Sequence, residues 1–254
     1  TYSADSHTLY GALTSSPAAD WPKGSMRSIV EWDTNKPLGE IEQVEHTYAV
    51  IGNMNEHQLT VVESTWGGRP ELVDTTGIID YGSLMQLALE RAKTAREAIK
   101  VMTGLVKKYG YYSSGESFTI ADPNEAWILD LIGKGPGRRG AVWVAVRIPD
   151  DCIAGHANYP RIHKIPMDDK ENCLYSPDVI SFAREMGYFD GLNKDFSFAR
   201  AYSPADFGAL RACDARVWSF FRKYDSSMDN YLPYVNGESA EPFPLYVKPS
   251  RKLS

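Results

Sequence analysis

The sequence is poor in cysteine and contains no long hydrophobic run. Its three cysteines, Cys152, Cys173 and Cys213, have neither a CxxC spacing nor a nearby histidine in a zinc-binding pattern. Because three is an odd number, at least one thiol is unpaired within a monomer, and we expect all three to be buried free thiols. No apolar stretch approaches the roughly 20 residues that span a bilayer. No basic segment followed by an apolar one marks a signal peptide near Thr1.

An excess of positive charge is also missing. The 254 residues include 27 Lys and Arg against 33 Asp and Glu, a net charge of −6. This balance argues against a nucleic-acid partner, which favours a basic face. Aromatic residues reach 12%, which suits a carbohydrate or peptide pocket and equally a large β-rich core. The length is sufficient for one large core or two small ones.

Compact catalytic motifs are absent as well. The chain has no GxSxG nucleophile elbow, no HExxH, and no phosphate loop ending in GK[ST]. The glycine-rich stretch GKGPGRRG (133–140) lies between two predicted strands, so it predicts a hairpin turn. An N-terminal Thr can act as a nucleophile with its own amine as the base, which makes Thr1 a candidate on position alone. The residues by themselves reveal no self-contained nucleophile–base pair.

Three predicted hairpins indicate an antiparallel sheet. Residues 46–64 predict two strands around a turn at 53–56, and residues 116–132 predict two more around the turn DPNE. The glycine-rich turn then leads into AVWVAVRIPD. The runs ILDLI and VWVAV are almost continuously apolar, as in strands that are covered on both faces.

Helical spacing of apolar residues follows in three places. Residues 82–110 predict a helical stretch that ends at Gly110. Ser-Pro pairs at 176–177 and 203–204 predict the N-caps of two more helices. The segment after Asp225 is rich in Pro and Tyr, and it predicts an extended peripheral tail over 226–254. Together these elements predict a layered α+β fold.

Two polar stretches at strand ends are candidate functional segments. GHANYPRI (155–162) contains Asn158, whose amide can donate to a developing oxyanion or simply cap a loop. VVESTWGGR (61–69) ends in two glycines that either admit a ligand to the backbone or form a turn. Arg216 lies on a mostly apolar helix face, where an active-site role competes with a buried structural ion pair.

Six stretches in order resemble one family. They are NMNEHQL, VESTWGGR, ESFTIADPNEAWILDLIGKG, GAVWVAVRIPDD, HANYPRI and ARVWSFF. They are similar to the dipeptidase A-type cysteine peptidases, relatives of penicillin V acylase and bile salt hydrolase, from Tyr2 to Leu253. The resemblance implies a four-layer αββα N-terminal nucleophile hydrolase fold over 1–225, cleavage of amide bonds in dipeptides, and no metal or organic cofactor.

The resemblance also implies the site residues. The family nucleophile is an N-terminal Cys on a first strand, which would precede Thr1, so Thr1 matches an interior position. Asp5 matches the carboxylate that orients the nucleophile, and Thr65 the position whose backbone N–H contributes to the oxyanion hole. Asn158 matches the second oxyanion donor, and Arg216 the Arg that stabilises the Cys and nearby charge.

One position departs from the family pattern, because Tyr2 stands where many relatives have an Arg that would depress the thiol pKa. The other expected substrate contacts are Glu63, Trp66 and His156. If the first strand is missing, this chain alone should be inactive, and a second copy or another segment would cover the open sheet edge. The resemblance favours a secreted or periplasmic location, with a cytoplasmic one as the alternative. Other functions left open are a non-catalytic binding relative and an acylase acting on a non-peptide amide.

Overall fold

The computed structural model describes residues 15–251. Two of the expected site residues, Tyr2 and Asp5, lie outside the described residues. Within 15–251, none of the helices is both long and apolar enough to cross a membrane.

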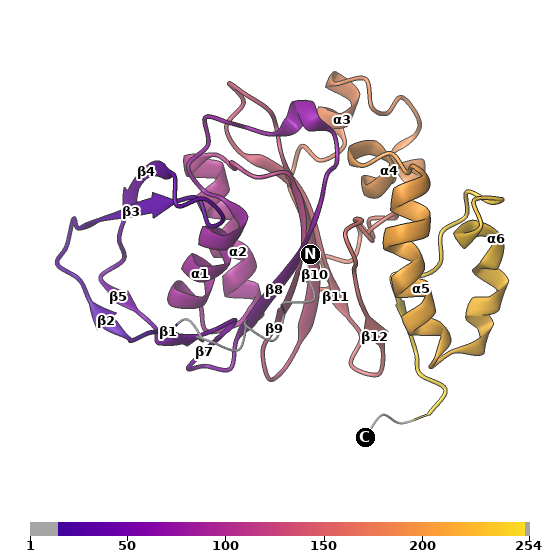
Figure 1. Ribbon diagram of the computed structural model, residues 1–254, viewed down its shortest axis with the longest axis horizontal. Helices are drawn as coiled ribbons and strands as arrows, with labels where there is room; N and C mark the ends of the chain where they lie inside the picture. The colour runs from indigo at the N-terminus through magenta and orange to yellow at the C-terminus, as the bar shows by residue number, and fades with distance from the viewer. Residues whose placement is uncertain (1–14, 252–254) are drawn as a thin grey trace.

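A large antiparallel sheet forms the centre of the molecule (Figure 1). In the described part of the chain it has eight strands in the order β1-β6-β7-β8-β9-β10-β11-β13. Their bounds are β1 (Ser15–Ser16), β6 (Val50–Ile51), β7 (Met54–Asn55), β8 (Thr60–Trp66), β9 (Gly115–Ala121), β10 (Ala126–Gly133), β11 (Ala141–Ile148) and β13 (Cys173–Tyr175). The remaining strands pair as β2 (Ala19–Asp20) with β5 (His46–Thr47), β3 (Met26–Val30) with β4 (Pro37–Glu42), and β12 (Ile153–Ala154) with β14 (Tyr246–Val247).

Helices cover both faces of this sheet. They are α1 (Tyr81–Arg91), α2 (Ala95–Tyr109), α3 (Ser181–Glu185), α4 (Phe198–Tyr202), α5 (Ala215–Arg222) and α6 (Leu232–Val235). Shorter 3-10 turns span Pro70–Leu72, Asn193–Asp195 and Ser226–Tyr231, and a π-helical segment, Ala209–Asp214, leads into α5. Figure 1 shows α1 and α2 on one side of the sheet, and α4, α5 and α6 on the other.

Two hydrophobic clusters explain this layering. On the α1/α2 side, Val61 and Phe118 of the sheet pack with buried leucines of α1 and Met102 of α2. On the opposite side, Ile128 and Val144 pack with aromatic residues of α3 and α4. Strand β10 is buried along almost its whole length because its two faces serve two different clusters.

The hairpins at 116–132 and 133–148 are confirmed. Strand β10 pairs with β9 through Ala126 opposite Ala121, and with β11 over its full length. In the first turn the Asp122 carboxylate accepts hydrogen bonds from the backbone N–H groups of Asn124 (2.7 Å) and Glu125 (3.0 Å). This side-chain turn explains why the local sequence was sufficient to predict the reversal.

The other local predictions differ from the structure in detail. Residues 46–64 reverse twice rather than once, because the Asn55 carboxamide oxygen accepts from the N–H groups of His57 and Leu59 and forms a second turn. The helical stretch 82–110 ends at Gly110 as predicted, but it is two helices, and the side chain of Thr94 caps the second.

Neither predicted Ser-Pro cap is formed. The hydroxyl of Ser176 accepts from the Trp143 backbone N–H, and the α-helix begins at Ser181. Ser203 ends α4, whereas Asp206 caps the next helical segment by accepting from Ala209 N (2.7 Å). The Ser176 hydroxyl thus has a tertiary partner in the sheet. At the second position, Asp206 takes the place of Ser203 as the helix cap.

The segment after Asp225 is not an extended chain throughout, as had been predicted. It forms a 3-10 turn and α6, and then β14 pairs with β12. Tyr234 and Phe243 are almost fully buried in a third cluster with Val217 and Phe221 of α5. The aromatic side chains that suggested an irregular tail therefore anchor it to the core.

Candidate active site

Asn158 lies in the loop after β12 and is held by hydrogen bonds at its backbone and at its side chain. Its backbone N–H donates to Ser64 Oγ (3.2 Å), and its Nδ2 donates to the Thr65 carbonyl oxygen (2.5 Å). Its backbone has φ of 55°, a left-handed conformation that Asn tolerates better than most residues. The loop therefore presents the carboxamide at the edge of β8.

Arg216 fixes the orientation of this carboxamide. From α5 its Nη2 donates to Asn158 Oδ1 (2.8 Å) and to the Ala157 carbonyl oxygen (3.0 Å). Because a guanidinium only donates, the acceptor oxygen of Asn158 faces α5 and the NH₂ group faces β8. Arg216 is exposed, so the alternative of a buried ion pair is wrong for this residue; Arg161 forms that ion pair instead.

Thr65 contributes its backbone to the same edge. Its carbonyl points toward Asn158, and in an extended strand the N–H and C=O of one residue point to the same side. Val61, four residues earlier in the same phase, directs its N–H away from β9 to Asn53 O (3.1 Å). The Thr65 N–H therefore lies at the same open edge of β8 as the Asn158 NH₂ group. Thr65, Asn158 and Arg216 are thus brought together, as the sequence comparison implied.

The His156 side chain connects the loop to strands β8 and β9 by hydrogen bonds. Its Nδ1 lies 2.6 Å from Ser64 Oγ, and its Nε2 lies 2.9 Å from Thr119 Oγ1. Burial, with a smaller contribution from the Arg161 charge, lowers the pKa of His156 to about 4. The ring is therefore neutral near pH 7, and it joins the loop to β8 and β9 through two hydroxyls. These contacts hold the loop that carries Asn158, and a contact of His156 with substrate stays a prediction.

The two remaining expected substrate contacts within the described residues lie apart from each other. The Trp66 indole is 1% exposed and donates to Ser117 Oγ (3.1 Å), so its ring is part of the core. Gly68 has φ of +68°, and a Cβ there would lie 2.8 Å from this indole, which favours the simple turn over a ligand contact. Glu63 lies on the α1/α2 side of β8 beside Thr65, whose hydroxyl is 3.5 Å from Glu63 Oε2.

Glu116 is the ionisable group at this site that sequence reasoning missed. It lies opposite Thr65 in β9, is 0% exposed, and accepts from Thr65 Oγ1 (2.8 Å). Burial, reinforced by the nearby charge of Glu63, raises its pKa to about 10 despite the Thr65 hydrogen bond. A lone acidic residue in an otherwise hydroxyl-rich strand, SFT, was the available signal.

We expect Glu116→Gln to stabilise the protein increasingly as the pH rises. The folded pKa lies above the unfolded value near 4.5, so the folded state binds more protons between pH 4.5 and about 10. Stability from this group is complete below pH 4.5 and is lost as the pH rises through that window. Because Gln does not ionise, the variant should unfold with a free energy about 1–3 kcal/mol higher at pH 7. Urea unfolding of both proteins at pH 4.5, 7 and 8.5 measures this, and equal differences at all three would contradict it.

The thiols of Cys152 and Cys173 are not activated. Burial raises the pKa of Cys173 to about 11, and burial with the adjacent Asp151 raises the pKa of Cys152. All three cysteines are free, but only Cys173 is fully buried, so the expectation of three buried thiols is corrected for Cys152 and Cys213. Within residues 15–251 none of them is hydrogen-bonded to Thr65, Asn158 or Arg216.

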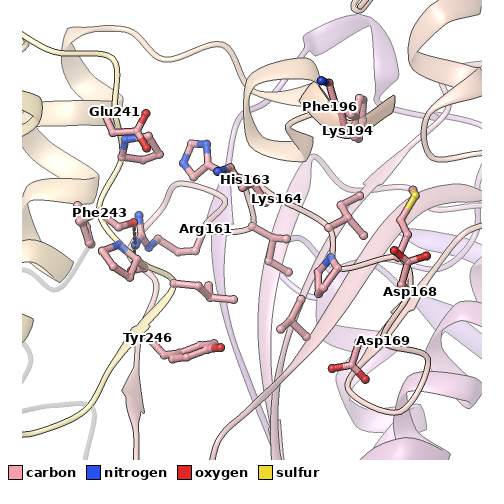
Figure 2. A pocket seen from close by; sticks show the side chains of 18 of the residues that line it. Arg161, His163, Lys164, Asp168, Asp169, Lys194, Phe196, Glu241, Phe243 and Tyr246 are labelled. Carbon is pink, nitrogen blue, oxygen red and sulfur yellow. Dashed lines mark hydrogen bonds between the residues drawn. The ribbon is translucent and has the colours of Figure 1, made fainter. Parts of the chain in front are cut away.

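A large cavity lies elsewhere. It has a volume of about 1030 Å³ between the segment that follows Arg161 and the segment around Phe243. Figure 2 shows His163, Lys194, Glu241 and Tyr246 around it. None of the expected site residues lines it, so size alone does not identify the site. Within residues 15–251 no group of three His, Cys, Asp or Glu residues could hold a metal ion.

Comparison with known proteins identifies one family over almost the whole chain. Residues 2–254 match the model described as peptidase family C69. A protein named probable dipeptidase from Salmonella dublin is 28% identical over 243 residues, which cover 92% of this chain and 51% of that protein. Another from Latilactobacillus sakei is 35% identical over 172 residues, 68% of this chain and 33% of the relative. The matched residues therefore cover about half the length of the first relative and a third of the second. On the match over essentially its whole length, this chain belongs to peptidase family C69.

Proposed function

We propose that the protein hydrolyses the peptide bond of dipeptides with a cysteine nucleophile at a mature N-terminus that precedes Thr1. The names of the two relatives support the substrate class. The placement of the nucleophile outside the sequence follows from the family resemblance, and the unactivated thiols of Cys152 and Cys173 are consistent with it.

The observation that carries the proposal is the pair of donors at the edge of β8. Arg216 holds Asn158 so that its NH₂ group lies next to the Thr65 backbone. Two preorganised neutral donors that converge on one point are what a tetrahedral intermediate of acyl transfer requires. Among the described residues, β7 pairs with β8 only at Thr60, so the edge beside Thr65 is open to the strand that would carry the nucleophile.

The chemistry then proceeds in two halves. The α-amine of the terminal Cys, with an ordinary pKa of about 7.7–8.0, accepts the thiol proton, and the thiolate attacks the peptide carbonyl. The Thr65 N–H and the Asn158 amide stabilise the oxyanion. The intermediate collapses, the C–N bond breaks, and the departing amine takes the proton. Water then hydrolyses the thioester, with the same α-amine as the base.

The four-layer αββα arrangement is part of this proposal. The α1/α2 layer and the central sheet would be two of its layers. The opposite face of β8 supports a further sheet, because Val62 on that face is 44% exposed in the described structure. A second sheet packed there would bury it.

The test is made on the full-length mature protein. Intact mass and N-terminal sequencing should give Cys as the first residue, and replacing that Cys by Ala should abolish dipeptide hydrolysis. Cys152→Ala, a partly buried thiol outside the site, should retain it. A mature protein without an N-terminal Cys that binds dipeptides but does not cleave them would instead be a non-catalytic relative. Preferential cleavage of an acylated non-peptide amide would make it an acylase.

A further inference from the structure

A row of polar side chains crosses the sheet on the face that contacts the loop carrying Asn158. Ser64 of β8 lies opposite Ser117 of β9, and Ser117 lies opposite Asp130 of β10. On the same face of β10, two residues before Asp130, Ile128 belongs to the apolar cluster with α3 and α4. A carboxylate in such surroundings is costly unless its oxygens are hydrogen-bonded, so its partners indicate its role.

Both carboxyl oxygens of Asp130 have hydrogen-bond donors. Asp130 is 0% exposed, and its Oδ1 accepts from Ser117 Oγ (2.5 Å). Its Oδ2 accepts from the backbone N–H groups of Arg161 and Ile162, each at 2.9 Å. The carboxylate therefore joins strand β9 to the loop after β12.

These bonds also connect the two segments that carry the oxyanion donors. Ser117 Oγ accepts from the indole N–H of Trp66 (3.1 Å), and Trp66 directly follows Thr65 in β8. On the loop side, Arg161 comes three residues after Asn158. A single buried carboxylate thus lies between the strand of one donor and the loop of the other.

We propose that Asp130 is a positioning residue for the oxyanion donors: its ionised carboxylate fixes the loop of Asn158 to the sheet, and its protonation weakens this attachment. This inference rests on the proposed function. Because Asp130 is buried, it acts through Asn158 and not by contact with the substrate.

The ionisation of Asp130 falls in a range that kinetics can follow. Burial raises its pKa to about 6, although the hydrogen bonds from Ser117, Ile162 and Arg161 lower it. The carboxyl group is therefore ionised at pH 8 and mostly protonated at pH 5. An ionised acceptor forms stronger hydrogen bonds than a neutral one, so the loop is attached most firmly above pH 6.

Other groups around Asp130 must be distinguished from it. The titratable or charged residues of the surrounding segments are His156, Tyr159, Arg161, His163 and Asp214. Burial lowers the pKa of His156 to about 4 and that of His163 to about 3, whereas burial raises the pKa of Tyr159 far above neutrality. Burial also raises the pKa of Asp214, which is paired with Arg161. The experiment must therefore separate the Asp130 and Asp214 carboxyl groups.

The first test compares Asp130→Asn with the wild type in the full-length protein between pH 5 and 8. At pH 8 the variant should have a kcat about tenfold lower, with KM changed less than about twofold. The two kcat values should converge as the pH falls through about 6, because the wild-type carboxyl group then loses its charge. The terminal α-amine is common to both proteins, so its titration cancels in their ratio. A ratio that is the same at every pH would overturn the inference.

Ser117→Ala is a milder variant that identifies the carboxyl group. It removes a hydrogen bond that lowers the pKa of Asp130, so the loss of kcat on acidification should begin at a higher pH than in the wild type. Ser176→Ala, at another buried serine, accepts from the Trp143 backbone in the wild type and should leave the profile unchanged. An unshifted profile in Ser117→Ala would assign the transition to another group, such as Asp214, and overturn the inference.

A double mutant distinguishes positioning from a general loss of stability. If Asp130 acts through Asn158, then Asp130→Asn should change kcat less than about twofold in an Asn158→Ala background. A variant that merely destabilises the fold would lose the same factor in both backgrounds, and that outcome would contradict a positioning role.

A measurement without substrate separates this inference from the proposed function. In NMR spectra of the full-length protein, the amide protons of Arg161 and Ile162 should shift together near pH 6, and Ser117→Ala should move that shift to higher pH. Hydrolysis without this titration would overturn the role of Asp130 and leave the peptidase proposal intact. The titration without hydrolysis of any dipeptide would support the attachment of the loop and overturn the peptidase proposal.

Discussion

Asn158→Ala in the full-length protein should lower kcat about a hundredfold or more, with a much smaller change in KM. The Asn158 NH₂ group is one of two donors at the edge of β8, and Arg216 holds its orientation. Removing one oxyanion donor typically raises the barrier by about 3 kcal/mol, because the interaction develops only as the carbonyl oxygen becomes charged. Steady-state hydrolysis of a dipeptide at saturating and limiting concentrations measures the two parameters separately.

Two further variants separate this effect from backbone strain. Asn158→Asp keeps the size of the side chain and tolerates the left-handed φ of 55°, yet it removes the NH₂ donor, so it should be as impaired as the Ala variant. Gln58→Ala removes an exposed carboxamide from a residue with a similar φ of 62° and should retain wild-type kcat. An unchanged kcat in Asn158→Ala would exclude Asn158 from the mechanism.

The second large effect concerns stability: Asp214→Asn should destabilise the protein by about 3–5 kcal/mol. Arg161 and Asp214 are both 0% exposed, and Arg161 Nη1 donates to both carboxylate oxygens at 2.8 and 3.0 Å. The Arg161 guanidinium also donates to the Pro244 carbonyl (2.8 Å) and stacks 3.9 Å from the Phe243 ring. Loss of the carboxylate charge leaves a buried guanidinium without its counter-ion, which is the costly way to break such a pair.

An exposed ion pair in the same region is the control. Arg222 and Asp229 are bonded to each other on the surface, with side chains 54% and 56% exposed. Asp229→Asn should therefore cost less than about 1 kcal/mol. Urea unfolding gives both values. If the two variants were equally stable, the buried pair would not hold the C-terminal segment to the core.

The buried pair also supports the candidate site. The backbone N–H groups of Arg161 and Ile162 both donate to Asp130 Oδ2 at 2.9 Å, which fixes the chain shortly after Asn158. We therefore expect Asp214→Asn to impair activity as well, through the position of the loop. At the other end of the loop, the neutral ring of His156 fixes it to Ser64 and Thr119.

The sequence by itself determined the elements whose cause is local. The turn at Asp122 closes with hydrogen bonds from residues two and three positions later. Gly110 ends α2 with its own φ of 80°. Both features could therefore be predicted from a few neighbouring residues. The consecutive tight turns and the apolar runs of β10 and β11 sufficed to predict an antiparallel sheet. The six ordered stretches identified the family, and the family pattern named Thr65, Asn158 and Arg216 as candidate site residues.

Only the tertiary structure decided which charges are buried and where hydroxyls find partners. Glu116 meets Thr65, 51 residues away, and Arg161 meets Asp214, 53 residues away, so neither pairing leaves a signal within a local window. Ser176 became a partner of the sheet rather than a helix cap for the same reason. Desolvation and long-range hydrogen bonding depend on what surrounds an atom in space. Desolvation and the hydrogen bond to Thr65 together set the pKa of Glu116 beside the candidate site.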